Sequence, residues 1–149
     1  MPPLPSPLRV VLCGRMAAVG KPVAAGLLPD YEVIHFIQSV DAAIAELPHL
    51  LAGRDPQAAS PNDVGTHDYS QPARAVIFGR GYQRSEVEEI RRRCAGSASQ
   101  PIAWVIGDPA NAPTGLPPPG YAQKTGQTIK DTLDRWRADG GVREEIYVY

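Results

Sequence analysis

Short apolar runs alternate along the chain with segments whose apolar residues recur every three or four positions. Runs that are almost continuously apolar are typical of strands buried on both faces, as in parallel sheets. Four such runs predict strands at residues 8–13, 31–37, 73–78 and 101–106. A fifth strand is predicted over residues 142–149, where Ile146 and Val148 alternate with tyrosines in the pattern of an edge strand.

Helices are predicted between these strands from their spacing and their capping residues. The first carries Val19, Val23 and Leu27 on one face, and we expect Pro22 to fit only if it lies in the first turn. Ser39 is the expected N-cap of the second helix.

The second helix is expected to stop at Gly53, with Pro48 as an earlier kink or end. Ser85 with Glu88 three residues later predicts a capping box at the start of the third helix. The last helix is marked by apolar residues at 129, 133 and 136.

Strands and helices therefore alternate from one end of the chain to the other. This order favours parallel pairing through right-handed crossovers. We expect an α/β fold that is Rossmann-like and doubly wound, with a mostly parallel sheet of about five strands and helices on both faces. The length of 149 residues fits one domain. The last strand has an alternative partner, which is a second copy of the chain.

Prolines divide the chain into ordered elements and stiff loops. The 16 prolines cluster in three places, which predicts a flexible segment at residues 1–7 and long loops at 54–72 and 108–120. The loop over 54–72 is long for a compact domain, so it is either a functional loop or a partly disordered one.

Charge and composition exclude several classes of protein. The net charge is −1 and the basic residues form no stripe, so we expect no nucleic-acid partner. No apolar run approaches the length of a membrane span, and cytoplasmic localisation is the default expectation. Cys13 and Cys94 have no second ligand at metal-binding spacing, so no metal site is predicted.

Ligands of open parallel sheets bind beyond the carboxyl ends of the strands. Glycines there let the backbone approach an anion, and arginines grip phosphate or carboxylate groups. The residues expected to bind a ligand follow the first and third strands: Gly14, Arg15, Met16, Gly79, Arg80 and Tyr82.

The first strand–helix turn only partly matches a dinucleotide-binding fingerprint. Met16 and Val19 stand where the second and third glycines belong, and Gly20 follows one residue late. No acidic residue follows the second strand to hold a ribose. NAD or NADP therefore remain open as cofactors, with a degenerate site.

Four residues are candidates for catalysis. Cys13 precedes a helix N-terminus, where a thiol pKa can fall and favour a nucleophile; a small core residue is the alternative. His67 beside Asp68, or Asp108 after the fourth strand, would supply acid–base chemistry. His35 lies inside an apolar strand and is expected to be a core histidine with its hydrogen bonds satisfied.

Several segments resemble short Rossmann-like proteins that are predicted in filamentous fungi. The resemblance covers most of the chain up to about Trp104 and rests on residues 10–14, 19–20, 31–36, 45–53, 74–79 and 87–91. It implies kinship with NAD(P)-binding domains and points to no particular reaction.

Two functions fit these observations. The first is a domain that binds a small ligand, as a nucleotide-dependent or accessory enzyme. The second is a non-catalytic module that kept the fold, lost the cofactor site and forms a homodimer through its last strand.

Overall fold

The computed structural model describes residues 6–58, 62–112 and 115–149. Most of the segment 1–7, which was expected to be flexible, lies outside the described residues. The strands are β1 (Leu8–Cys13), β2 (Tyr31–Ile37), β3 (Ala75–Phe78), β4 (Ala103–Ile106) and β5 (Ile146–Val148). The helices are α1 (Ala17–Leu27), α2 (Val40–Leu51), α3 (Arg84–Arg93), α4 (Tyr121–Ala138) and a short 3₁₀ helix, η1 (Pro109–Asn111).

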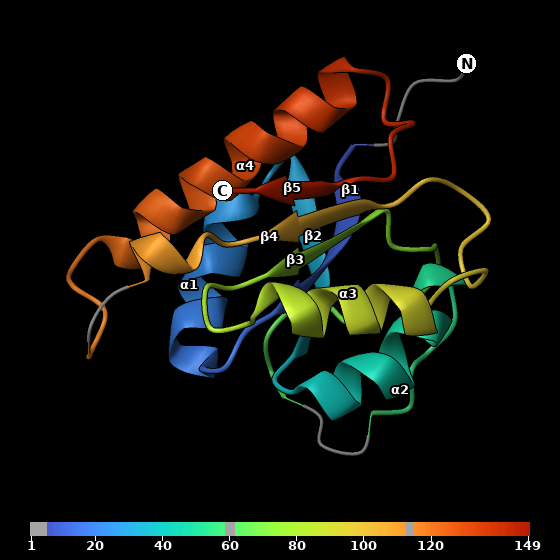
Figure 1. Ribbon diagram of the computed structural model, residues 1–149, viewed down its shortest axis with the longest axis horizontal. Coiled ribbons are helices and arrows are strands. Elements are labelled where there is room, and N and C mark those ends of the chain that lie inside the picture. The colour runs from blue at the N-terminus through green and yellow to red at the C-terminus, as the bar shows by residue number, and fades with distance from the viewer. Residues whose placement is uncertain (1–5, 59–61, 113–114) are drawn as a thin grey trace.

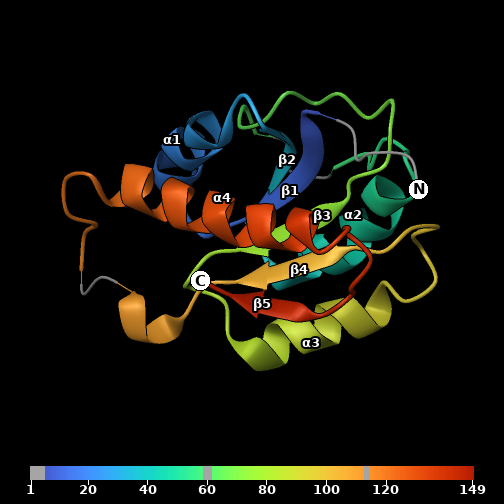
Figure 2. The same cartoon turned by 90° about the horizontal axis from the view of Figure 1, so that it is seen from above.

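The described strands form one sheet of five in the order β2-β1-β3-β4-β5, and every neighbouring pair is parallel (Figure 1). Helices α2 and α3 lie on one face, while α1 and α4 pack side by side on the other (Figure 2). Adjacent strand residues point to opposite faces: Val11 packs with α2 and α3, and Val10 packs with α1 and α4. The α/β, doubly wound fold is thus confirmed.

The strand order reverses between β1 and β3. From β1 the chain first moves outward to β2, and it then crosses back to place β3 on the other side of β1. This is the flavodoxin-like order, whereas the dinucleotide-binding order is 3-2-1-4-5-6. The switch point, where such sheets bind ligands, therefore lies between the ends of β1 and β3.

The described part of the loop over residues 54–72 covers the outer edge of β2. The N–H groups of Thr66 and His67 donate to the carbonyls of Val33 and Ile34, each at 2.9 Å. A Cβ on Gly65 would lie 3.0 Å from the β2 backbone, so this close approach requires glycine. These loop residues are ordered, and they shield a strand edge that would otherwise be open.

The last strand forms the opposite edge of the sheet. It pairs with β4 of its own chain, and the N–H of Tyr149 extends the ladder to the carbonyl of Ile106 at 3.0 Å. Val148 is 47% exposed. No described strand covers the outer side of β5.

Three strands are shorter than predicted. In two of them, a backbone N–H before the observed strand donates its hydrogen bond to a group outside the sheet. The N–H of Ala73 donates to the carbonyl of Leu50 at the end of α2, so β3 begins at Ala75 and not at residue 73. The N–H of Ile102 donates to the Glu144 side chain, so β4 begins at residue 103. Of the predicted strand over 142–149, only 146–148 are paired.

Two helix predictions are wrong in detail. Pro22 lies beyond the first turn of α1, and the helix continues to Leu27, whose buried side chain anchors the segment to the sheet. The third helix begins at Arg84, because Gln83 is its N-cap and the N–H of Gln83 donates to Glu86 at 2.8 Å. The predicted box of Ser85 and Glu88 therefore starts two residues too late.

The cap of the second helix is confirmed. Ser39 is the N-cap of α2, and its hydroxyl accepts the N–H of Ala42 at 3.1 Å. The helix passes through Pro48 and ends at Leu51, two residues before Gly53.

Candidate functional site

A cavity of about 230 Å³ lies at the switch point of the sheet. Five of the six residues predicted to bind a ligand line it, and they follow β1 and β3: Gly14, Arg15, Met16, Gly79 and Arg80. Helices α1 and α4 and the loop before α4 complete the walls. We call this space the arginine cavity. Its lining residues within the described ranges include two arginines and no carboxylate.

Glycines bring the backbones around this cavity close together. The N–H of Gly79 donates to the carbonyl of Cys13 at 2.8 Å, which continues the pairing past the ends of β1 and β3. A Cβ on Gly107 would meet Arg80 Cγ at 2.5 Å and Tyr149 Cζ at 3.0 Å. Gly107 therefore makes room for Arg80 to cross the end of β4, a role that the sequence did not reveal.

Gly20 allows α1 to pack closely on the sheet, which is one role of the glycines in a dinucleotide-binding fingerprint. A Cβ at this position would lie 2.5 Å from Cε2 of Phe36, a residue of β2. In dinucleotide-binding folds the third glycine allows the helix to pack closely on the sheet. Gly20 allows the same close packing one residue later, with the Phe36 ring as the neighbour. Met16 and Val19, which replace the other glycines, line the cavity.

Arg80 is held in the cavity without a described acidic partner. Its Nη1 donates to the hydroxyl of Tyr121 at 3.1 Å and to that of Thr125 at 3.0 Å. The guanidinium lies 5.0 Å from the ring centroid of Tyr149. Its Nε is buried and has no hydrogen-bond acceptor among the described residues. A buried donor without an acceptor is costly, so the fold holds Arg80 in this position at the expense of stability.

The guanidinium of Arg15 packs on the ring of Tyr82. The guanidinium carbon of Arg15 lies 4.1 Å from the ring centroid of Tyr82, and Nη2 lies 3.3 Å from Glu86 Oε2. Tyr82 itself is buried and does not line the cavity. Burial raises the pKa of its hydroxyl, which stays protonated. The structure thus makes Tyr82 a support for Arg15.

The start of α1 adds to the positive potential of the cavity. Its N-cap, Met16, makes no side-chain capping bond. The first N–H groups of a helix lack intrahelical partners and carry the positive end of its dipole. These groups lie at the same end of the sheet as both arginines.

Cys13 lines the arginine cavity but is fully buried. Burial is the main cause that raises the pKa of its thiol, and the charge of Glu46 raises it further while Arg15 lowers it. A thiol in this state is protonated at neutral pH, whereas a nucleophile needs the thiolate. The geometry favours the role of a small core residue.

The other catalytic candidates lie away from the cavity. His67 is exposed at the edge of β2. Asp68 accepts hydrogen bonds from Ser70, which lower its pKa, and pairs with Arg9 at 3.1 Å. Asp108 caps η1 by accepting the N–H of the residue at 110 at 2.9 Å. The structure does not bring these acids together with the binding residues.

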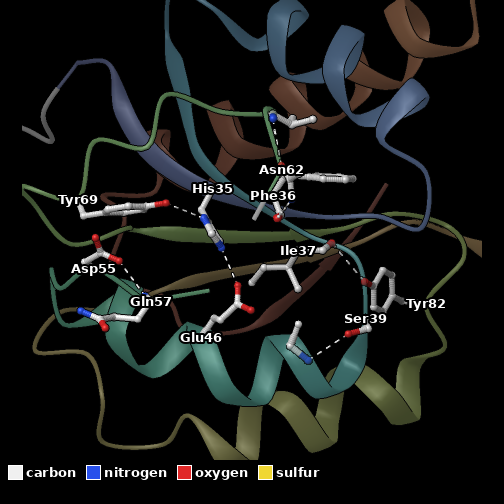
Figure 3. A network of polar contacts seen from close by, with 12 residues as sticks. His35, Phe36, Ile37, Ser39, Glu46, Asp55, Gln57, Asn62, Tyr69 and Tyr82 are labelled. Carbon is white, nitrogen blue, oxygen red and sulfur yellow. Dashed lines mark hydrogen bonds and ion pairs between the residues drawn. The ribbon is translucent and has the colours of Figure 1, made fainter. Parts of the chain in front are cut away.

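A buried polar network lies between β2, α2 and the edge-covering loop (Figure 3). His35 is 3% exposed, as expected for a core histidine. Its Nε2 lies 2.7 Å from Glu46 Oε1, and its Nδ1 lies 2.8 Å from the hydroxyl of Tyr69. The sequence carried one signal for this pair: Glu46 occupies the apolar face of its helix, three residues after Ala43.

The described residues contain no helix long and apolar enough to cross a membrane. Nor do histidine, cysteine, aspartate and glutamate side chains gather there in groups of three or more that could hold a metal ion.

Comparison with known proteins places the chain in a fungal family. No protein-family model matches it. No solved structure matches it either. It is 35% identical over 145 residues to Kojic acid related protein 6 of Aspergillus oryzae, and the alignment covers 96% of this chain and 87% of that protein. The expected kinship with fungal proteins is thus confirmed, and the chain belongs to the family of Kojic acid related protein 6.

Proposed function

We propose that the protein binds a small organic anion in the arginine cavity. The observation that carries this proposal is the charge of the lining: Arg15 and Arg80 lie in it, and the described lining residues include no carboxylate. Apolar and aromatic residues form the rest of the wall. The ligand class is therefore a phosphate or carboxylate attached to a small apolar or aromatic body.

The hydroxyls around Arg80 favour an oxyanion. Tyr121 and Thr125 each accept a hydrogen bond from Arg80, which leaves their own O–H groups free to donate. These two hydroxyls, the guanidinium of Arg15 and the start of α1 supply donors around one space. Convergent donors of this kind recognise phosphate and carboxylate oxygens.

The size of the cavity limits what it encloses. Its volume of about 230 Å³ is below the roughly 300–1,000 Å³ that is usual for drug-sized ligands. The cavity therefore holds one anionic group with a small ring. NAD or NADP would place only one phosphate inside, with the remainder outside.

We propose binding and no catalytic step. Cys13 is protonated at neutral pH, and the acid–base candidates lie outside the cavity. An enzyme built on this site would need its reacting groups from the ligand or from a second protein.

A thermal-shift screen tests the proposal. The probes are FMN, NAD, NADP, inorganic phosphate and kojic acid, the last chosen because of the relative's name. A ligand at one hundred times its dissociation constant adds about 2.7 kcal/mol, which raises Tm by roughly 5–10 °C for a chain of this size. Arg80→Ala should abolish the shift. The control is Arg92→Ala, which removes an exposed arginine of α3 that pairs with Glu89.

A shift that persists in Arg80→Ala, or no shift with any anionic probe, overturns the proposal.

The open edge of β5, with Val148 half exposed, favours a homodimer as the second candidate function. Sedimentation equilibrium distinguishes the two: a dimer without ligand binding supports the interaction module.

A further inference from the structure

A second cavity, of about 430 Å³, lies beyond the end of β2. Its walls are the end of β2, the first two turns of α2 and the start of the edge-covering loop. Six of its described lining residues are polar: Gln38, Ser39, Asp41, Glu46, Gln57 and Asn62. Its described lining residues include two carboxylates and no lysine, arginine or histidine. We call it the glutamate cavity.

Glu46 presents one carboxylate oxygen to the core, and its other oxygen has no hydrogen-bond donor among the described residues. The side chain is buried, with the residue 8% exposed, and Oε1 lies 2.7 Å from His35 Nε2 (Figure 3). No described residue donates a hydrogen bond to Oε2, although Glu46 lines the cavity. A carboxylate has acceptor capacity on both oxygens, so half of this capacity is unused.

A chain of hydrogen bonds runs from Tyr69 through His35 to Glu46. With a neutral imidazole, the O–H of Tyr69 donates to His35 Nδ1, and His35 Nε2–H donates to Glu46. Burial raises the pKa of Tyr69, and the charges of Asp55 and Glu46 raise it further, so its hydroxyl remains a donor. In this arrangement both ring nitrogens of His35 are occupied, and Glu46 Oε1 accepts one hydrogen bond.

A buried carboxylate is costly unless a cation or several donors compensate it. Beyond the His35 ring, which contacts Oε1, two further ionisable groups near this network are acidic: Asp41 lines the same cavity, and the charge of Asp55 acts on Tyr69. We propose that the glutamate cavity is a second binding site, which takes a small organic ammonium compound whose N–H groups donate to Glu46 Oε2. This site is independent of the anion site.

An ammonium group fits the cavity better than a metal ion. A divalent cation takes six or more oxygen ligands, and two carboxylates are few for that purpose. No group of three or more metal-ligating side chains is found in the described part of the chain. Binding of Mg²⁺ or Ca²⁺ in place of the ammonium probe would contradict the proposal.

Titration of the full chain with n-butylammonium chloride, followed by two-dimensional amide NMR, tests this site. The matched neutral probe is 1-butanol. We expect saturable shifts at the amides of Gln38, Ser39 and Ala42 with the ammonium compound alone. Glu46→Gln should weaken binding about tenfold, because it removes the charge-assisted hydrogen bond. Asp41→Asn should weaken it about twofold, since Asp41 is exposed.

The controls separate this site from folding and from the anion site. The amide oxygen of Glu46→Gln can still accept from His35, so the core bond is retained, and the NMR spectrum reports the fold. Arg80→Ala should leave butylammonium binding unchanged. The proposal fails if 1-butanol shifts the same amides equally, or if Glu46→Gln binds as tightly as the natural chain. Should Glu46→Gln unfold, the comparison of the two probes and the Asp41→Asn variant still decide.

Discussion

The arginine cavity and the glutamate cavity lie at the same end of the sheet and hold their charges differently. Arg80 is held by two hydroxyls and keeps an unpaired nitrogen. Glu46 is bound to a buried histidine. The first charge has no described carboxylate partner, whereas the second is also part of the core. Phe36 lines both cavities, so they share a wall.

The largest expected effect is on stability at the glutamate cavity. Glu46→Ala leaves a buried N–H of His35 without its acceptor, and the free energy of unfolding should fall by about 3 kcal/mol. Glu46→Gln retains a hydrogen bond and should lose less than half as much. Urea unfolding at pH 7 measures both. Equal losses in the two variants would show that the hydrogen bond to His35 contributes nothing.

The next largest loss of stability is expected at Phe36, the residue that lines both cavities. Gly20→Ala places a methyl group against the Phe36 ring and should lower the free energy of unfolding by about 1–3 kcal/mol. The matched control is Gly26→Ala on the same helix, where a Cβ meets nothing within 4 Å. This control should raise stability by about 0.5–1 kcal/mol, since alanine favours helix. If both variants were destabilised alike, packing on Phe36 would not be the cause.

The arginine cavity should tolerate substitution better than the glutamate cavity. Arg80→Ala removes hydrogen bonds to two hydroxyls and no described ion pair, so the loss should be about 1 kcal/mol. Urea unfolding beside Glu46→Ala makes the comparison direct. A loss as large as that of Glu46→Ala would mean that Arg80 is a structural residue, and it would weaken the case for a ligand.

The last effect concerns the thiols and is confined to alkaline pH. Burial raises the pKa of Cys94 from 9.0 to about 11, and it also raises the pKa of Cys13, which lines the arginine cavity. A raised pKa in the folded state stabilises the fold below the unfolded pKa, and this contribution is lost as pH rises. Stability should therefore fall between about pH 9 and 11, and Cys94→Ala should flatten this fall. An unchanged slope in the variant would assign the loss to the tyrosines.

The sequence predicted the sheet because its strands are apolar on both faces. Runs such as residues 8–13 and 31–37 match the observed strands to the residue. The third and fourth strands were drawn too long, because bonds from Ala73 to α2 and from Ile102 to Glu144 depend on tertiary contacts. The same is true of the Gln83 cap.

The gathering of the predicted binding residues around one cavity has a geometric reason. Parallel strands end at one edge, so Gly14 and Arg80 had to approach each other once the strand order was known. The glutamate cavity was missed because it joins distant segments. Glu46 on an apolar helix face and His35 in an apolar strand were the only local signals, and no pattern connected Tyr69 to them.

The unequal edges of the sheet limit how copies of the chain can join. The loop occupies the hydrogen-bonding groups of β2, and only β5 offers a free edge among the described strands. Pairing of two β5 edges uses the free edge of each copy, so association of this kind closes at two. Removing the loop would expose a second edge on every copy, and the sheet could then grow without end into a filament. Residues 62–69 thus cover the edge at which such growth would begin.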